Sequence, residues 1–272
     1  MTRNVSKFRK LRSRLHQWGL RRTIFVLFFL LLDAARYWVW DLWHGVETRK
    51  KVLVSDLGIE GLNHANDAEA YVCASHRFLS RIREVNVDWK EFTFIDLGAG
   101  KGKTLLLAAS LPFKKIIGVE LSPKMVRIAE QNLTRNRHFN AQCKNLEIVL
   151  QDAAAYQFPL DPLVIYCFNP FTAAVMTEVL QNLKRSFQRL PRPVYWLYVN
   201  PVHKRLFSQC DFIHLMKEEE GFSLYGAEPP KEEPVSTVVL RIRGQTVRHA
   251  TGRERDFLNS RKARQGDGPL RC

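Results

Sequence analysis

A glycine-rich run from Phe94 to Lys103, FIDLGAGKGK, contains the residues best suited to hold a small ligand. Gly98, Gly100 and Gly102 allow the backbone to turn tightly and to approach a ligand without Cβ atoms in the way. A helix that begins near Gly102 would direct its N-terminal N–H groups to the same place. The run therefore predicts a binding loop between a strand and a helix.

Three classes of binding loop share this composition, and the spacing separates them. A dinucleotide-binding loop requires G-x-G-x-x-G, but counting from Gly98 puts Lys103 at the third glycine position. A phosphate-binding P-loop would need a glycine where the chain has Leu97. The acid-x-G-x-G-x-G pattern of an adenosylmethionine loop is complete, with Asp96 as its acid. A carboxylate suits that ligand, which carries an ammonium and a sulfonium and no phosphate.

Two further carboxylates follow strand-like runs. Glu120 lies twenty residues after Gly100, where a carboxylate can accept hydrogen bonds from both hydroxyls of a ribose. Asp152 follows the next run, where a carboxylate can bind an adenine amino group. We therefore predict a cofactor site of nine residues. These are Asp96, Gly98, Ala99, Gly100, Gly102, Glu120, Leu121, Asp152 and Ala153.

Short apolar strands that alternate with amphipathic helices must position these residues. Strands are expected at 92–97, 115–120, 146–150, 163–168 and 194–199, with helices near 102–111, 123–136, 173–190 and 202–209. Continuous apolar strands of this kind are typical of a parallel sheet covered on both faces. The stretch 212–243 should supply the last strands, at least one of them antiparallel. The pattern predicts an α/β fold with a doubly wound, mostly parallel sheet.

Composition and charge divide the chain into four parts. A hydrophobic fraction of 46% excludes wholesale disorder, and the formal net charge of +15 is concentrated toward the two ends. Residues 1–45 form a basic and hydrophobic segment, residues 46–90 a connector with a lid helix, residues 91–243 the catalytic domain, and residues 244–272 a basic flexible tail. Basic ends suggest attraction to a polyanion, either phospholipid headgroups or nucleic acid.

The N-terminal segment combines positive charge with apolar side chains. Residues 1–22 contain eight Lys or Arg and no acidic residue, with Phe8, Leu11, Leu15 and Trp18 on one helical stripe. Residues 23–32 then carry no charge, and a cluster of Trp follows. A spanning helix needs about 20 apolar residues. We therefore expect an in-plane helix or shallow hairpin at an anionic membrane surface on the cytoplasmic side, with a helix packed on the catalytic domain as the alternative.

Residues 92–201 resemble the class I S-adenosylmethionine-dependent methyltransferases, whose motifs cover the first five strands in order. A narrower resemblance, from about residue 44 to 209, is to a group of largely uncharacterised bacterial methyltransferases. It is carried by HGVET (44–48), the glycine loop, GVELSP (118–123), FNPF (168–171) and YVNP (198–201). The resemblance implies a Rossmann-like, seven-stranded fold, S-adenosylmethionine as the cofactor, and methyl transfer as the reaction.

The same resemblance places the catalytic residues at Asn169, Pro170 and Phe171. The Asn oxygen and the Pro carbonyl would hold the N–H groups of an amine or amide, and Phe171 would pack against the acceptor or the sulfonium. Nitrogen methyltransferases usually have [DN]-P-P-[FY], and the missing second proline leaves the acceptor atom open. We expect N-methylation of a protein side chain or of a membrane-associated small molecule. A nucleic-acid methyltransferase and a non-catalytic binding module are the alternatives, and Asn-Pro could also be a simple turn.

Three other features carry weaker signals. Tyr71 heads the expected lid helix and could close over the cofactor, and His203 could remove a proton, although both could equally be structural. The five scattered cysteines contain no C-x-x-C pair and predict neither a disulfide framework nor a zinc site. Cys143 and Cys167 lie in or near apolar runs and are expected in the core. No metal is expected.

Overall fold

The computed structural model describes residues 20–49, 52–59, 61, 63–65, 78–136, 140–229, 237–242 and 245–250. The chain forms two compact units, the first ending at Glu228 and the second beginning at Pro229. The first unit contains a seven-stranded sheet with helices, and the second contains a two-stranded hairpin.

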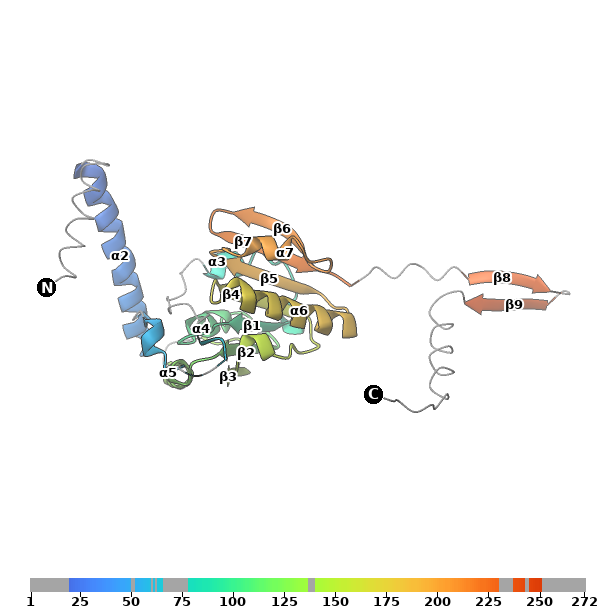
Figure 1. Cartoon of the computed structure of the whole chain (residues 1–272), viewed down its shortest axis with the longest axis horizontal. Coiled ribbons are helices and arrows are strands. Elements are labelled where there is room, and N and C mark those ends of the chain that lie inside the picture. The colour runs from blue at the N-terminus through green and yellow to red at the C-terminus, as the bar shows by residue number, and fades with distance from the viewer. Residues whose placement is uncertain are drawn as a thin grey trace. The chain divides into compact units, whose positions relative to one another are not determined.

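The sheet of the first unit has the strand order β3-β2-β1-β4-β5-β7-β6 (Figure 1). Its strands are β1 (Thr93–Leu97), β2 (Lys115–Glu120), β3 (Leu146–Leu150), β4 (Leu163–Phe168), β5 (Val194–Val199), β6 (His214–Glu219) and β7 (Phe222–Ala227). The first five run parallel, and β7 pairs antiparallel with both β5 and β6. The predicted doubly wound, mostly parallel sheet is confirmed. The strand order reverses between β1 and β4, where ligands bind in folds of this kind.

The helices of the first unit are α2 (Leu20–His44), α3 (Phe78–Ile82), α4 (Lys103–Ala108), α5 (Pro123–Arg135), α6 (Ala173–Arg189) and α7 (Lys204–Phe207). Local sequence explains the start of α5, because Ser122 caps it by accepting a hydrogen bond from the N–H of Met125 at 3.2 Å. Pro123 occupies the first turn, where its missing N–H costs nothing.

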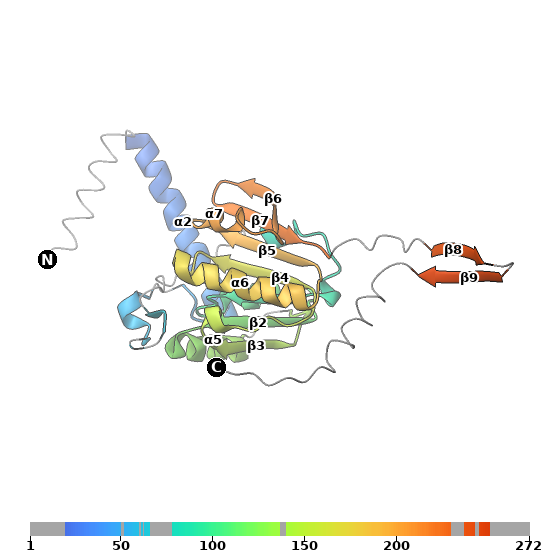
Figure 2. The ribbon, with the colours of Figure 1, turned by 45° about the vertical axis from the view of Figure 1, so that its right-hand side comes forward.

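The sheet is buried on both faces, which is why its strands are almost continuously apolar. Ile95 and Leu97 of β1 pack in one core with residues of α6 such as Leu183. Phe94, on the opposite side of the same strand, packs in a second core with Leu105 of α4. Figure 2 shows α6 in front of the sheet. Cys143 and Cys167 are buried in these cores, as predicted.

The stretch 212–243 supplies the last two strands of the sheet, β6 and β7, as expected, but its final run does not join them. The run near 236–243 forms β8 (Thr237–Ile242), which pairs only with β9 (Gln245–Ala250), in the second unit. The sheet is completed instead by β6, joined to β7 through a tight connection containing Gly221 at φ +72°. A short antiparallel connection closes at little entropic cost, so the local hairpin takes the edge of β5. Residues 245–250, predicted within a flexible tail, are a strand; residues 251–272 lie outside the described part.

The described part of the N-terminal segment, residues 20–44, forms one continuous helix, α2, with no break at Asp33 or Arg36. A shallow hairpin is therefore excluded for residues 20–44. Within the described residues, we find no helix with the length and apolar character needed to cross a bilayer. The stripe from Phe8 to Trp18 and the expected lid residue Tyr71 lie outside the described residues.

Candidate active site

The glycine loop connects β1 to α4 at the switch point of the sheet. Gly98, Gly100 and Gly102 have φ values of +79°, +54° and +76°, in the left-handed region that favours glycine. At position 98 glycine is also required by space, because a Cβ there would lie 2.5 Å from the Cβ of Pro170, which follows the neighbouring strand β4. The loop therefore lies directly against the predicted acceptor motif. Ala99 is buried and donates its N–H to the carbonyl of Val119 at 3.1 Å.

Glu120, at the end of β2, supports the loop as well as facing the expected ribose site. Its Oε2 accepts the N–H of Gly100 at 2.8 Å, and its Oε1 accepts the N–H of Ser122 at 2.9 Å. The Leu121 N–H also interacts with this carboxylate. A carboxylate has about four acceptor sites, so Glu120 retains acceptor capacity for the ribose. Burial raises the pKa of Glu120, and the backbone N–H groups act in the opposite direction. Leu121 follows and packs with Leu57.

Asp96, the acid of the loop pattern, lies beneath the loop and not at its surface. Its side chain is 2% exposed and hydrogen-bonds to Thr104 in the first turn of α4. Burial raises the pKa of Asp96 to about 8, with a smaller contribution from the nearby charge of Glu120 and an opposing one from Thr104. Its position indicates that it anchors the loop to α4.

Asp152 stands beyond the end of β3 and is contacted by a residue that the sequence did not single out. Its Oδ1 accepts the N–H of Ala154 at 2.9 Å, and its Oδ2 lies 2.6 Å from Nδ1 of His64. The other ring nitrogen of His64 lies 3.6 Å from Glu178 on α6. The connector before β1 therefore reaches the expected adenine site, next to the buried Ala153.

The acceptor motif lies at the end of β4, beside a second Asn-Pro at the end of β5. Asn169 and Asn200 have φ values of +39° and +50°, so each turns the chain sharply where its strand stops. The Tyr198 hydroxyl accepts the backbone N–H of His203 at 3.3 Å and lies 2.9 Å from Oδ1 of Asn169. Since the hydroxyl has one proton, it donates that proton to Asn169 and so orients the amide. Oδ1 keeps one acceptor site for a substrate N–H.

The two other candidate residues of the acceptor region, Phe171 and His203, have different surroundings. Phe171 is partly buried and packs against the core on the α6 face, so only part of its ring is available to a ligand. His203 meets Tyr198 through its backbone, which leaves the predicted proton-transfer role of its ring as a prediction.

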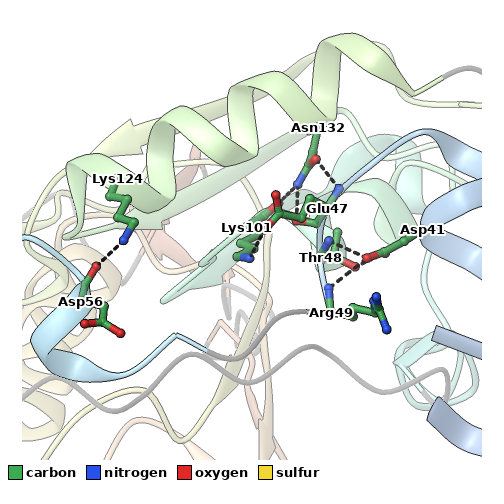
Figure 3. Close-up of polar contacts among 8 residues, drawn as sticks. All are labelled: Asp41, Glu47, Thr48, Arg49, Asp56, Lys101, Lys124 and Asn132. Carbon is green, nitrogen blue, oxygen red and sulfur yellow. Dashed lines mark hydrogen bonds and ion pairs between the residues drawn. The ribbon is translucent and has the colours of Figure 1, made fainter. Parts of the chain in front are cut away.

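A strap formed by residues 45–49, directly after α2, clamps the glycine loop (Figure 3). Asn132 on α5 bridges the two: its Oδ1 accepts the N–H of Glu47 at 2.8 Å, and its Nδ2 donates to the carbonyls of Glu47 and Lys101 at 3.1 and 2.9 Å. Lys101 is buried and donates to Oε1 of Glu47 at 2.9 Å. The strap is held in turn by the buried Asp41 of α2, which accepts hydrogen bonds from Thr48 at 2.8 and 2.5 Å.

Lys103, the residue that gave the loop its partial likeness to a P-loop, is covered by α2. Its Nζ lies 4.2 Å from the ring centroid of Tyr37 and 4.4 Å from that of Trp40, and the residue is 1% exposed. A P-loop lysine must reach a bound phosphate. This one makes cation–π contacts inside the protein instead, so the P-loop interpretation is excluded.

Sequence reasoning therefore located the loop and the strand ends but missed the residues that hold them. Asn132, His64 and Tyr198 lie far along the chain from their partners. Two signals were available in the sequence: HGVET at 44–48, which contains most of the strap, and YVNP at 198–201, which contains Tyr198. Both carried the family resemblance, but neither indicated which residue its side chains would contact.

Comparison with known proteins identifies the central part of the chain. Residues 94–193 match the family model described as a methyltransferase domain. The match covers 100 of the 272 residues and runs from β1 to the residue before β5. It confirms for this range the broader resemblance, to methyltransferases.

Two curated relatives match part of the chain. An "Uncharacterized RNA methyltransferase" of Chlamydia muridarum is 28% identical over 163 residues, 59% of this chain and 37% of that protein. A protein of the same description from Chlamydia caviae is 29% identical over 121 residues, 43% of this chain and 28% of that protein. The chain therefore spans only about a third of the length of these relatives.

Solved structures with a similar fold include an RNA methyltransferase from Salinibacter ruber in complex with S-adenosyl-L-homocysteine. It is 20% identical with a TM-score of 0.42, over 60% of this chain and 97% of that one. A human methyltransferase 10 domain containing protein is 13% identical with a TM-score of 0.41, over 58% of this chain and 85% of that one.

Proposed function

We propose that the protein transfers a methyl group from S-adenosylmethionine to a nitrogen atom of its substrate. The observation that carries this proposal is the glycine loop at the switch point of the sheet, with the N–H of Gly100 bound by Glu120 at 2.8 Å. This arrangement puts a carboxylate, not a phosphate-binding group, beside the loop, as a cationic ligand with a ribose requires. The match to the methyltransferase family supports the same conclusion.

The chain's own residues would act by binding and orientation. Glu120 would accept the ribose hydroxyls and Asp152 the adenine amino group, while Asn169 and the Pro170 carbonyl would hold the N–H groups of the acceptor. The bound cofactor supplies a methyl group that is already activated by a sulfonium. Alignment of nucleophile, methyl and sulfur can lower such a barrier by about 7–11 kcal/mol. Tyr198 contributes by orienting the Asn169 amide.

RNA is the acceptor class favoured by the names of the two curated relatives. The formal net charge of +15 fits a polyanionic substrate. This reverses the order expected from the sequence, where a protein side chain or a membrane-associated small molecule came first. We therefore place RNA first. A protein side chain or a membrane-associated small molecule remains the second candidate, because the Asn-Pro motif would hold an amine from any of these substrates.

Cofactor binding is tested by calorimetry with S-adenosylhomocysteine on the full chain. We expect saturable binding, with no comparable heat from NAD or ATP. ATP binding that is lost in Lys103→Ala would contradict the proposal. Retained binding with no transfer to any acceptor would favour the non-catalytic module.

The acceptor is tested by incubating the full chain with cofactor labelled in its methyl group and with total RNA, total protein or a lipid extract. Label in RNA that is sensitive to ribonuclease, and lost in Asn169→Ala, is the expected result. Lys184→Ala is a suitable control, because Lys184 pairs only with the exposed Asp211 among the contacts described. Label in protein or lipid alone would replace RNA by the second candidate.

A further inference from the structure

Helix α2 carries an exposed apolar face. Among the side chains of α2 that the structure describes, nine large apolar ones are between 44% and 70% exposed, and six of them are Ile24, Leu31, Leu32, Trp38, Val39 and Leu42. With 3.6 residues per turn, these six fall within a sector of about 120° around the helix axis. We call this the outer face. Phe25, Phe28 and Trp43 are exposed as well.

The opposite side of the same helix is docked on the methyltransferase domain. Tyr37 and Trp40 contact Lys103 of α4, and Asp41 binds the strap. These positions lie about half a turn away from the centre of the outer face. The domain therefore occupies one side of the last turns of α2 and leaves the apolar side exposed. Soluble proteins rarely expose this many large apolar side chains on one side of a helix without a partner for them.

The sequence around the outer face identifies the partner. Residues 1–22 contain eight Lys or Arg and no acidic residue, and two of these, Arg21 and Arg22, lie in the first turn of α2. Positive charge beside an apolar helical face with Trp is the combination that binds the surface of an anionic bilayer. RNA would bind the basic residues, but it offers no apolar surface against which Leu31 or Leu42 would pack. A second copy of the chain could cover the apolar face but would repel the basic residues.

We infer that the outer face of α2 lies in the interface of an anionic lipid bilayer, of the kind found on the cytoplasmic leaflet, and holds the domain there. We infer an in-plane orientation, because the exposed apolar side chains lie on one side of the helix and the domain lies on the other. Because the opposite side of α2 contacts Lys103 and the strap, the lipid contact and the contact with the glycine loop use different sides of the helix. The anchor does not depend on the identity of the methyl acceptor.

The test uses the full chain with two kinds of vesicle, phosphatidylcholine alone and phosphatidylcholine with an equal part of phosphatidylglycerol. The test variant is Leu31→Gln, Val39→Gln, Leu42→Gln, since Gln keeps a helix propensity close to that of Leu. The matched control is Leu160→Gln, Leu190→Gln, Val202→Gln, which alters the same residue types at positions 41–61% exposed outside α2. Circular dichroism and S-adenosylhomocysteine binding are measured for all three proteins.

We expect the wild-type chain and the control to sediment with anionic vesicles and more weakly with neutral ones. The outer-face variant should lose at least about a hundred-fold in partitioning, because three large apolar side chains no longer enter the bilayer. Its helicity and its affinity for S-adenosylhomocysteine should not change. Quenching of Trp emission by brominated lipids should fall in parallel.

Three results would overturn the inference. The wild-type chain could ignore both vesicles, or the outer-face variant could bind them as the wild type does, which would leave charge alone as the cause. The wild-type chain could also be a dimer that the outer-face variant splits, with no vesicle binding, and a second copy would then be the occupant. Failure of the proposed function is seen separately, as loss of S-adenosylhomocysteine binding by the wild-type chain without lipid.

Discussion

Substituting Glu120 by Gln should show how strictly the site depends on a carboxylate at the end of β2. Both oxygens of Glu120 accept backbone N–H groups, from Gly100 at 2.8 Å and Ser122 at 2.9 Å. Gln has nearly the same shape, but its amide group would face one of these N–H groups, donor against donor. One ribose hydroxyl would also lose its acceptor, and the other would keep a neutral acceptor in place of a charged one.

The expected loss of affinity follows from these contacts. A hydrogen bond to a charged group contributes about 1.5–3 kcal/mol, so S-adenosylhomocysteine should bind about ten- to a hundred-fold more weakly. The free energy of unfolding should change less. Burial, which raises the pKa of Glu120, also means that its charged form destabilises the folded protein. The neutral amide of Gln removes this destabilisation but loses one hydrogen bond to the backbone.

The assay is calorimetric titration with S-adenosylhomocysteine, together with thermal unfolding of the free protein. Glu147→Gln is the matched control, because Glu147 on the neighbouring β3 forms an exposed ion pair with Lys115 at 2.7 Å. Such a pair contributes about 0–1 kcal/mol, so the control should bind as the wild type does. If Glu120→Gln also binds unchanged, the ribose lies elsewhere and the proposed cofactor geometry is wrong.

Three further substitutions test the loop, its buried acid and the acceptor site. Gly98→Ala should unfold at lower temperature than Gly58→Ala, since both incur about 1–2 kcal/mol of left-handed backbone strain but only Gly98 would also clash with Pro170. Asp96 has a pKa of about 8 in the folded protein and about 3.9 when unfolded. Between these pH values the folded protein keeps a proton that the unfolded chain releases, so the free energy of unfolding should fall as the pH rises from about 3.9 to about 8. Asp96→Asn should flatten that part of a melting-temperature profile, and an unchanged slope would mean that Asp96 is not the group responsible. Tyr198→Phe should leave S-adenosylhomocysteine affinity within about twofold but slow methyl transfer at least about fivefold, since the Asn169 amide loses a bond worth about 1 kcal/mol. An equal loss in both measurements would indicate a general structural role for Tyr198.

The parts of the fold that are encoded locally could be predicted from the sequence. The five parallel strands were expected within one residue of their observed bounds, because each is a short apolar run between turn residues. The three glycines of the loop have positive φ values, as their spacing indicated. Glu120 and Asp152 were expected at strand ends for the same reason: the carboxyl ends of parallel strands meet at one edge of the sheet.

The hairpin and the N-terminal helix show where local pattern was insufficient. The stretch 212–243 was expected to supply the last strands with no pairing fixed. The structure completes the sheet with β7 and β6 and pairs the run 237–242 with 245–250. Competition for one edge depends on which partner is nearer along the chain, and periodicity contains no such information. For α2, the sequence predicted either a surface helix or a helix packed on the domain. The structure shows both features on one helix: Trp40 lies on the side that packs on the domain, and the opposite side exposes apolar side chains. The two predicted arrangements are therefore not mutually exclusive.

By itself, the sequence determined the binding loop, the parallel strands and the residue types at the edge where they end, because these depend on neighbours a few positions apart. Only the tertiary structure decided what holds that edge in place. Asn132 reaches the strap across 85 positions, His64 reaches Asp152 across 88, and Tyr198 reaches Asn169 across 29. A side-chain hydrogen bond needs its two atoms within a few tenths of an ångström of the right distance. That precision arises only when the helices and strands have packed, so no pattern along the chain records it.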